Sequence, residues 1–197
     1  MTDILPGPLT IISRAIEARL QDVLPPAVFT YRWLPAKMDK TVWDLLIQRC
    51  PSVSLEFVGF ERAETSAQLY GTGVWNVWLA LKNARGTEAV LFGDSLGQGA
   101  LLVQQVAMVA LHAMVVKGAG TVLVVKALPM ALEGRDDPNT YVVRLTLMVE
   151  RVEILPVSVL SGNIIGGATL ATEVISWSFG DSGEIDQTDI INNTGTS

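Results

Sequence analysis

Residues that build most active sites are scarce in this sequence. Cys50 is the only cysteine and His112 the only histidine among 197 residues. One cysteine excludes an intrachain disulfide, and these two residues alone leave no Cys/His set for a zinc site. His112 lies inside an apolar segment, which is typical of a hydrogen-bonded core or interface histidine. We therefore expect no metal ion, no cofactor and no catalytic residues.

Charge is also scarce. Charged residues make up 17% of the chain, and the net charge of -6 comes without any cluster of basic residues. A nucleic-acid-binding surface must neutralise phosphates with lysine and arginine, so direct nucleic-acid recognition is not expected. By contrast, 49% of the residues are hydrophobic and the mean hydropathy is +0.38. This combination indicates buried contacts between subunits or with a membrane.

The longest apolar run is short for a membrane span. Leu101–Val116 has 16 residues and contains two glutamines and the histidine, whereas a spanning helix needs about 20 predominantly apolar residues. We therefore expect no membrane contact. The N-terminus lacks the basic start of a signal peptide and is interrupted by Pro6 and Pro8. Synthesis in the cytoplasm is the expectation.

The first quarter of the chain predicts a helix, a strand and a second helix. Apolar residues recur at three- and four-residue spacing over Pro8–Leu24, with charged residues between them, as in an amphipathic helix. Val28–Leu34 is a candidate strand. Asp39 or Thr41 can cap a short helix that ends at Arg49.

Most of the remaining ordered segments have strand patterns. Alternation of apolar and polar residues, or β-branched composition, predicts strands over Val53–Phe60, Val74–Lys82, Thr87–Phe92, Thr121–Leu128 and Tyr141–Val152. Within Val74–Lys82 the alternation places Trp75 on one face and Trp78 on the other. Both faces of this strand are therefore expected to meet other parts of the protein or a partner.

A long apolar helix is predicted between these strands, from Asp94 or Ser95 as the cap to Lys117. Helical spacing gives it two apolar stripes. One contains Val103, Ala107, Ala110 and Met114, and the other contains Met108, Leu111, His112 and Val115. We expect one stripe to face the sheet and the other to face a different element or a neighbouring subunit.

The order of these segments predicts an α+β fold over residues 1–155, with a mostly antiparallel sheet backed by two or three helices. From Pro156 the composition changes to serine, threonine, glycine and asparagine without a clear period. Residues 156–197 are therefore interpreted as an irregular C-terminal extension or arm. We hypothesise that this arm lies across a neighbouring subunit or a partner.

Loops that resemble chemical motifs are better explained as turns. Residues 93–99, GDSLGQG, lack the Lys-Ser/Thr pair that follows in a phosphate-binding P-loop. Asp136 and Asp137 precede Pro138 in an ordinary turn sequence without calcium-ligand spacing. The remaining candidate residues belong to a subunit or partner interface, because tryptophan and apolar side chains are enriched there. They are Trp75, Trp78, Met108, His112, Val115 and Trp177.

The order of elements and several segments resemble phage tail terminators, also called tail completion proteins. The segments are RCPSVSLEFVGF, GVWNVWLALKNARG, GALLVQQVAMVALHAM and TVLVVKALPMALEGRDDPNTYVVRLTLMV. The resemblance is to the Mu-like group with contractile tails and, more distantly, to lambda-like terminators, and it covers about residues 9–152.

This resemblance implies a structural protein and no enzyme. It implies a ring homo-oligomer, a hexamer, at the head-proximal end of the tail in the virion. The ring would end polymerisation of the tail tube protein, offer a docking face to the head-tail connector protein of the capsid and, in a contractile tail, contact the sheath protein. Two alternatives stay open. One is another head-tail connector or tail-tube structural protein, and the other is a small domain or enzyme that uses a cavity beside the apolar helix to bind a hydrophobic ligand.

Overall fold

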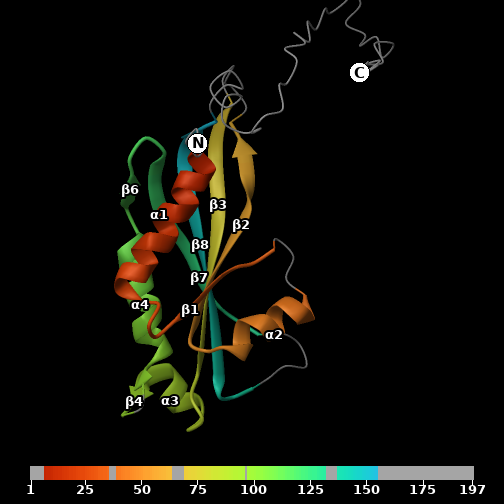
Figure 1. Cartoon of the computed structure of the whole chain (residues 1–197), viewed down its shortest axis with the longest axis vertical. Helices are drawn as coiled ribbons and strands as arrows, with labels where there is room; N and C mark the ends of the chain where they lie inside the picture. Colours follow the sequence, from red (N-terminus) through yellow and green to blue (C-terminus); the bar gives the residue numbers. More distant parts are fainter. Residues whose placement is uncertain (1–6, 36–38, 64–68, 96, 132–136, 155–197) are drawn as a thin grey trace, which may run out of the picture. The chain divides into compact units, whose positions relative to one another are not determined.

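The computed structural model describes residues 7–35, 39–63, 69–95, 97–131 and 137–154. These residues form four helices, one six-stranded sheet and a two-stranded hairpin (Figure 1). In chain order the elements are α1 (Pro8–Val23), β1 (Thr30–Trp33), α2 (Lys40–Gln48), β2 (Ser52–Arg62), β3 (Tyr70–Lys82), α3 (Thr87–Phe92), β4 (Gly93–Asp94), β5 (Gly97–Gln98), α4 (Ala100–Leu111), β6 (Met114–Val116), β7 (Gly120–Met130) and β8 (Thr140–Glu153).

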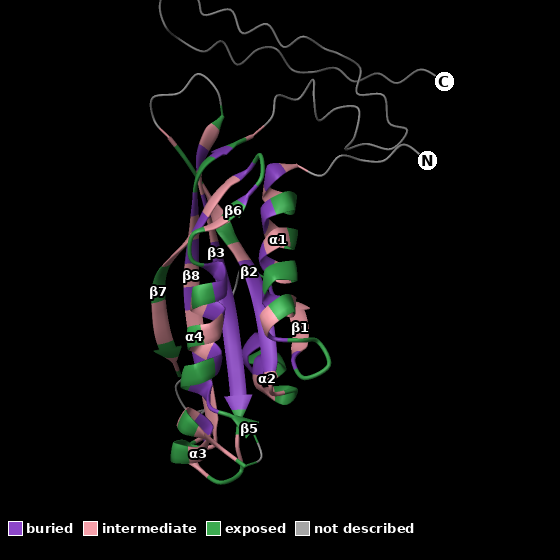
Figure 2. Ribbon diagram, turned by 90° about the vertical axis from the view of Figure 1, so that its left-hand side faces the viewer, coloured by how far each residue is buried: buried purple, intermediate pink, exposed green. Residues whose placement is uncertain are grey.

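The six strands of the main sheet follow the order β1-β2-β3-β8-β7-β6. Only the β1–β2 pair is parallel, and the other four pairs are antiparallel. Helices α1 and α4 pack on one face of the sheet, and α2 packs on the other face (Figures 1 and 2). The prediction of an α+β fold with a mostly antiparallel sheet backed by helices is confirmed.

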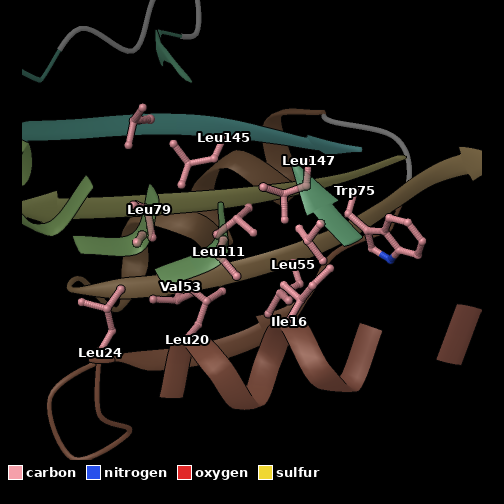
Figure 3. Packing of buried hydrophobic residues seen from close by; sticks show 14 of the residues in the cluster. Ile16, Leu20, Leu24, Val53, Leu55, Trp75, Leu79, Leu111, Leu145 and Leu147 are labelled. Atoms are coloured by element: carbon pink, nitrogen blue, oxygen red, sulfur yellow. The ribbon is translucent and has the colours of Figure 1, made fainter. Parts of the chain in front are cut away.

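The main hydrophobic cluster lies between the sheet and the pair α1 and α4 (Figure 3). Helix α1 contributes Ile12, Ile16 and Leu20, which are fully buried and spaced by four residues. This spacing places them on one side of the helix. Strand residues of the same face, among them Trp75, complete the cluster. The amphipathic helix predicted for Pro8–Leu24 is present with nearly the same bounds.

A second, smaller cluster lies under α2 on the opposite face. The Asp39 side chain caps this helix by accepting the Val42 N–H at 2.9 Å. Of the two predicted caps, Asp39 and Thr41, the structure therefore shows Asp39. Trp43 and Leu46 of α2 then pack against Trp78 of β3. Trp75 and Trp78 therefore lie on opposite faces of β3, as the alternation predicted. At these two positions each face of the strand is covered by its own helix layer.

Residues 87–92 form a helix and not the predicted strand. Gly86, with φ of 98°, turns the chain, and the Val90 N–H donates to the Gly86 carbonyl at 3.0 Å. The resulting single turn, α3, buries Val90 in the main cluster. A short apolar run carries no period that separates helix from strand, which is why the sequence pattern misled here.

The apolar helix is also shorter at both ends than predicted. It begins at Ala100 after Gly99, so neither Asp94 nor Ser95 caps it. At the other end His112 has extended dihedrals and Ala113 has φ of 60°, which stops the helix. The residues that follow form β6 and pair with β7. Strand β6 is rich in valine, and valine favours a strand where a sheet edge is near.

Strands β2, β3 and β7 extend beyond their predicted bounds. Strand β2 extends to Arg62 and β3 starts at Tyr70, so the hairpin between them is longer than the sequence pattern indicated. Strand β7 continues to Met130. The predicted extension over residues 156–197, with Trp177, lies outside the described residues.

Candidate functional site

The outward side of α4 is apolar, and no other described part of the chain covers it. Leu101 is 42% exposed, Leu102 is 51% exposed and Val109 is 73% exposed, and Gln105 is the exposed polar residue between them. We call these four residues the outer face of α4 (Figure 2). Surface helices normally carry charged residues on the solvent side, but α4 contains no Asp, Glu, Lys or Arg.

Neighbouring elements extend this apolar surface. Val115 of β6 is 75% exposed and Phe92 of α3 is 69% exposed. Both elements lie next to α4, one beyond each end of it (Figure 2). Contiguous exposed apolar patches on soluble proteins mark interaction sites. The outer face of α4 is therefore a candidate protein interface.

The two predicted stripes of this helix divide differently. Val103, Ala107 and Ala110 are buried toward the sheet, as expected for one stripe. Of the other stripe Leu111 is buried and Met108 is half-buried against the main cluster. His112 and Val115 of that stripe lie beyond the helix end and are exposed.

His112 is an exposed residue at the C-terminal end of α4. Its Nδ1 accepts the Val124 N–H at 3.3 Å, which links this end of the helix to β7. Arg19 of α1 donates from Nε to the Ala110 carbonyl at 3.1 Å, and Lys117 follows β6 as another exposed cation. Three cationic or titratable side chains therefore surround the C-terminal end of the apolar surface.

Trp75 and Trp78 do not contribute to a surface of the chain. They are 0% and 2% exposed, respectively. The Trp75 indole N–H donates to Ser13 Oγ at 3.0 Å, and the Trp78 indole N–H donates to Glu56 Oε2 at 2.8 Å. Their assignment as interface residues is therefore corrected: both bury their indoles inside the chain, because each face of β3 has its own hydrophobic cluster.

A second uncovered surface lies on the α2 side of the sheet. Val74, Leu123 and Met148 are in register on β3, β7 and β8, are half-buried and belong to neither cluster. Val58, at the β-bulge of β2, is 47% exposed. We call these four residues the open sheet face. No helix among the described residues covers it, because α2 packs only toward the other end of these strands (Figure 1).

A polar row separates the open sheet face from the cluster under α2. Glu56 is only 6% exposed, and its Oε2 accepts hydrogen bonds from Asn76 Nδ2 at 3.0 Å and from Trp78 Nε1 at 2.8 Å. Asn76 Oδ1 in turn accepts from Thr146 Oγ1 at 3.1 Å. Glu56 makes no ion pair with any described residue. A carboxylate thus lies nearly buried with neutral donors only.

Two cations, Arg144 and Lys126, lie on the same face, and neither forms an ion pair with Glu56. The Arg144 guanidinium stacks over the Trp78 ring at 5.6 Å from its centroid. Its Nε is buried without a hydrogen-bond partner in the described structure. Lys126 is paired in register with Thr146 and is exposed. The sequence had placed Glu56 on the polar side of its strand, but its burial depends on the packing of β3 and α2 and had no sequence signal.

An apolar cleft of about 550 Å³ opens at the end of α1 near α3. Its wall includes Val103, which faces inward from α4. The other lining residues are mainly apolar, with Lys82 and two amides among them: Val23, Pro25, Val28, Phe29, Pro51, Leu81, Lys82, Asn83, Ala84, Val90, Gly97 and Gln98. Such a cleft suits an apolar ligand or an apolar side chain of a partner.

Neither Cys50 nor Asp137, two groups near this cleft with a shifted pKa, has the properties of a catalytic nucleophile. Burial raises the pKa of the Cys50 thiol to about 11, and its Sγ lies 3.4 Å from the Ile47 carbonyl. The thiol is therefore neutral near pH 7 and unreactive. Asp137 accepts hydrogen bonds from Lys82, Asn139 and Thr140, and the Lys82 bond is the main cause that lowers its pKa. Asp137 is a turn residue, as predicted for this loop.

Residues 93–99 form no phosphate loop among the described positions. Gly93 and Asp94 pair with Gln98 and Gly97 as a small hairpin, and Gly93 has φ of 83°, which glycine adopts without strain. The described part of the chain holds no group of three or more His, Cys, Asp or Glu residues that could bind a metal.

No helix in the described ranges is long and apolar enough to cross a membrane. No protein-family model matches the sequence, and a search of curated proteins finds no match. The functional argument therefore depends on the surfaces of the molecule and on the resemblance drawn from its sequence.

Proposed function

We propose that this chain is a phage tail terminator, a structural protein that forms a ring at the head-proximal end of the tail tube. In this role it ends tube polymerisation and provides the docking face for the head-tail connector. The partners are further copies of itself, the tail tube protein, the connector and, in a contractile tail, the sheath. Its place is the virion.

The uncovered apolar outer face of α4 is the observation that carries this proposal. Val109 is 73% exposed and shares this face with the exposed Leu101 and Leu102, and a grouped apolar surface of this kind is typical of a protein interface; a ring subunit would bury it against its neighbour. Burying one valine or leucine side chain fully contributes about 1.5–3 kcal/mol. The fold gives further support: apart from the short elements α3, β4, β5 and β6, its order of helix, strand, helix, hairpin, helix and hairpin is the order of the segments that resemble tail terminators.

The first experiment measures the mass of the purified full-length chain by size-exclusion chromatography with light scattering over a range of concentrations. We expect a closed oligomer. Val109→Asp should lower the mass toward that of one subunit, because it would bury an unpaired carboxylate. Leu45→Asp is the control, since Leu45 of α2 is 41% exposed and lies outside both the outer face of α4 and the apolar cleft. A wild-type chain that stays monomeric at all concentrations contradicts the proposal.

The second experiment locates the protein in assembled particles by cryo-electron microscopy. A terminator occupies one ring between tube and connector. Repeated rings along the tube, or a place within the connector, would instead favour the alternative of another head-tail connector or tail-tube structural protein.

The apolar cleft beside α4 favours a second candidate function, the binding of a small hydrophobic ligand. Calorimetric titration with medium-chain fatty acids tests it. Binding that Val90→Trp abolishes by filling the cleft would support this function, because Val90 lines the cleft. The absence of heat with the folded wild-type chain would argue against it.

A further inference from the structure

The geometry points to a head-to-tail interface between copies of this chain: we infer that the outer face of α4 of one copy packs against the open sheet face of the next, where Glu56 receives a cation. This inference rests on the proposed ring and names the two surfaces that form it. It assigns a role to three features that the fold leaves unexplained, namely two uncovered apolar surfaces and one nearly buried carboxylate.

The two apolar surfaces lie on opposite faces of the same sheet. The outer face of α4 belongs to the helix layer on one side, whereas the open sheet face lies on the α2 side (Figure 1). Two different surfaces on opposite sides of a subunit form a heterologous contact, which closes into a ring when the rotation permits. Pairing of α4 with α4 in a twofold dimer would cover only one of them and would stop at two copies.

Glu56 supplies the charge argument. Both of its hydrogen bonds reach Oε2, and no described residue donates to Oε1. Removing a carboxylate from water is costly unless it is paired. The bonds from Asn76 and Trp78 hold this carboxylate in one orientation before any partner arrives. Such a group suits a cation from another chain.

The α4 side of a second copy provides that cation. Helix α4 has no carboxylate that would repel Glu56. Arg19 of α1 lies at its C-terminal end, donates to the Ala110 carbonyl and is an exposed cation, and Lys117 after β6 is a second exposed cation. The two surfaces therefore match in apolar character and in charge. Lys126 lies at the opposite end of the polar row, is exposed and remains solvated at the rim.

Paired variants of the full chain test the interface. Val109→Asp disables the outer face of α4, and Met148→Asp disables the open sheet face. Each variant alone should be monomeric, with association weakened at least 100-fold. An equimolar mixture should form a one-to-one dimer, because each variant retains the face that the other lacks. The mass of the mixture is measured by light scattering, and circular dichroism establishes that both variants are folded.

Glu56→Gln keeps the test valid if Met148→Asp does not fold. The glutamine oxygen can still accept from Asn76 and Trp78, so the thermal midpoint should stay close to that of the wild type. Ring dissociation should nevertheless become at least 10-fold easier, and the effect should persist in high salt, because salt screens a charge pair buried in an interface only weakly.

Three results would overturn the inference. They are a mixture that remains monomeric, a Met148→Asp variant that assembles like the wild type, and a Glu56→Gln variant with lower stability but unchanged assembly. In each of these the wild-type ring can still form, so the proposed function stands with another interface. A wild-type chain that never oligomerises overturns both the interface and the proposed function.

Discussion

The hydrogen bond between Trp75 and Ser13 offers a sharp prediction for the fold. The Trp75 ring is fully buried, and its N–H donates to Ser13 Oγ at 3.0 Å. The Ser13 hydroxyl in turn donates to the Leu9 carbonyl at 2.8 Å. This short chain of bonds fixes α1 on β3, so cutting it should loosen the contact between the N-terminal helix and the sheet.

The expected magnitudes follow from which partner is removed. Ser13→Ala leaves the buried indole N–H without an acceptor and should lower the free energy of unfolding by about 1–3 kcal/mol. Trp75→Phe removes the N–H together with ring volume and should cost about 2 kcal/mol as a partial core truncation. In the double variant no orphaned N–H remains. The loss should therefore be smaller than the sum of the single losses by about 1–2 kcal/mol.

Urea denaturation followed by far-ultraviolet circular dichroism measures these values. Ser54→Ala is the matched control, because Ser54 is 0% exposed but its Oγ has no hydrogen-bond partner in the described structure. Removing an unpaired hydroxyl should be neutral or stabilising by about 1 kcal/mol. Additive losses at Ser13 and Trp75, or equal effects of the two serine substitutions, would refute the reasoning.

Three further predictions concern single positions. Ala113→Gly should stabilise the fold by about 0.5–1 kcal/mol in urea denaturation. Alanine at φ of 60° is strained and glycine is not, and the net gain is the relieved strain minus the free energy that glycine's greater freedom gives the unfolded chain. Stability should fall as pH rises from about 9 to 11, because burial raises the pKa of Cys50 and the unfolded thiol ionises first; Cys50→Ala should flatten this part of the pH profile. Above pH 4, Asp137→Asn should lower the thermal midpoint by a small amount. In acid strong enough to protonate Asp137 the substitution should leave the midpoint unchanged, because the Lys82 hydrogen bond lowers the pKa of Asp137 and the stabilising effect of that bond disappears on protonation.

Segments with a long, regular period could be predicted from the sequence. Helix α1 repeats apolar residues over four turns, and β8 alternates regularly from Val143 to Glu150. In both, local pattern and tertiary contact agree, so burial in the structure falls on the predicted side. The same agreement explains why opposite faces could be assigned correctly to Trp75 and Trp78.

Short segments could not be predicted because their conformation depends on what lies beside them. Residues 87–92 carry a pattern that fits a strand or a helix, and contact with the main cluster decides for the helix. The residues after Leu111 continue the apolar period of α4. They nevertheless form β6, because β7 returns alongside and offers its edge at residues 120–122.

Of the candidate surfaces, too, one could be predicted from the sequence and one could not. Sequence spacing identified α4 as a helix with more apolar surface than one sheet can cover. The structure agrees, because Leu101, Leu102 and Val109 are exposed on this helix. The role of Glu56 could not be predicted, because a carboxylate on an alternating strand normally faces water. Its burial arises from Trp78 and Asn76, which become neighbours of Glu56 only after β2 and β3 pair.

Helix α4 also separates fold stability from assembly. It buries Ala100, Val103, Ala107, Ala110 and Leu111 toward the core, so its attachment to the sheet does not need the outer face. Leu101, Leu102 and Val109 contribute little to the isolated subunit while they remain exposed. A charge at position 109 should therefore leave the urea midpoint of the monomer nearly unchanged and act on association alone. A large loss of monomer stability would mean that the outer face already packs within the chain.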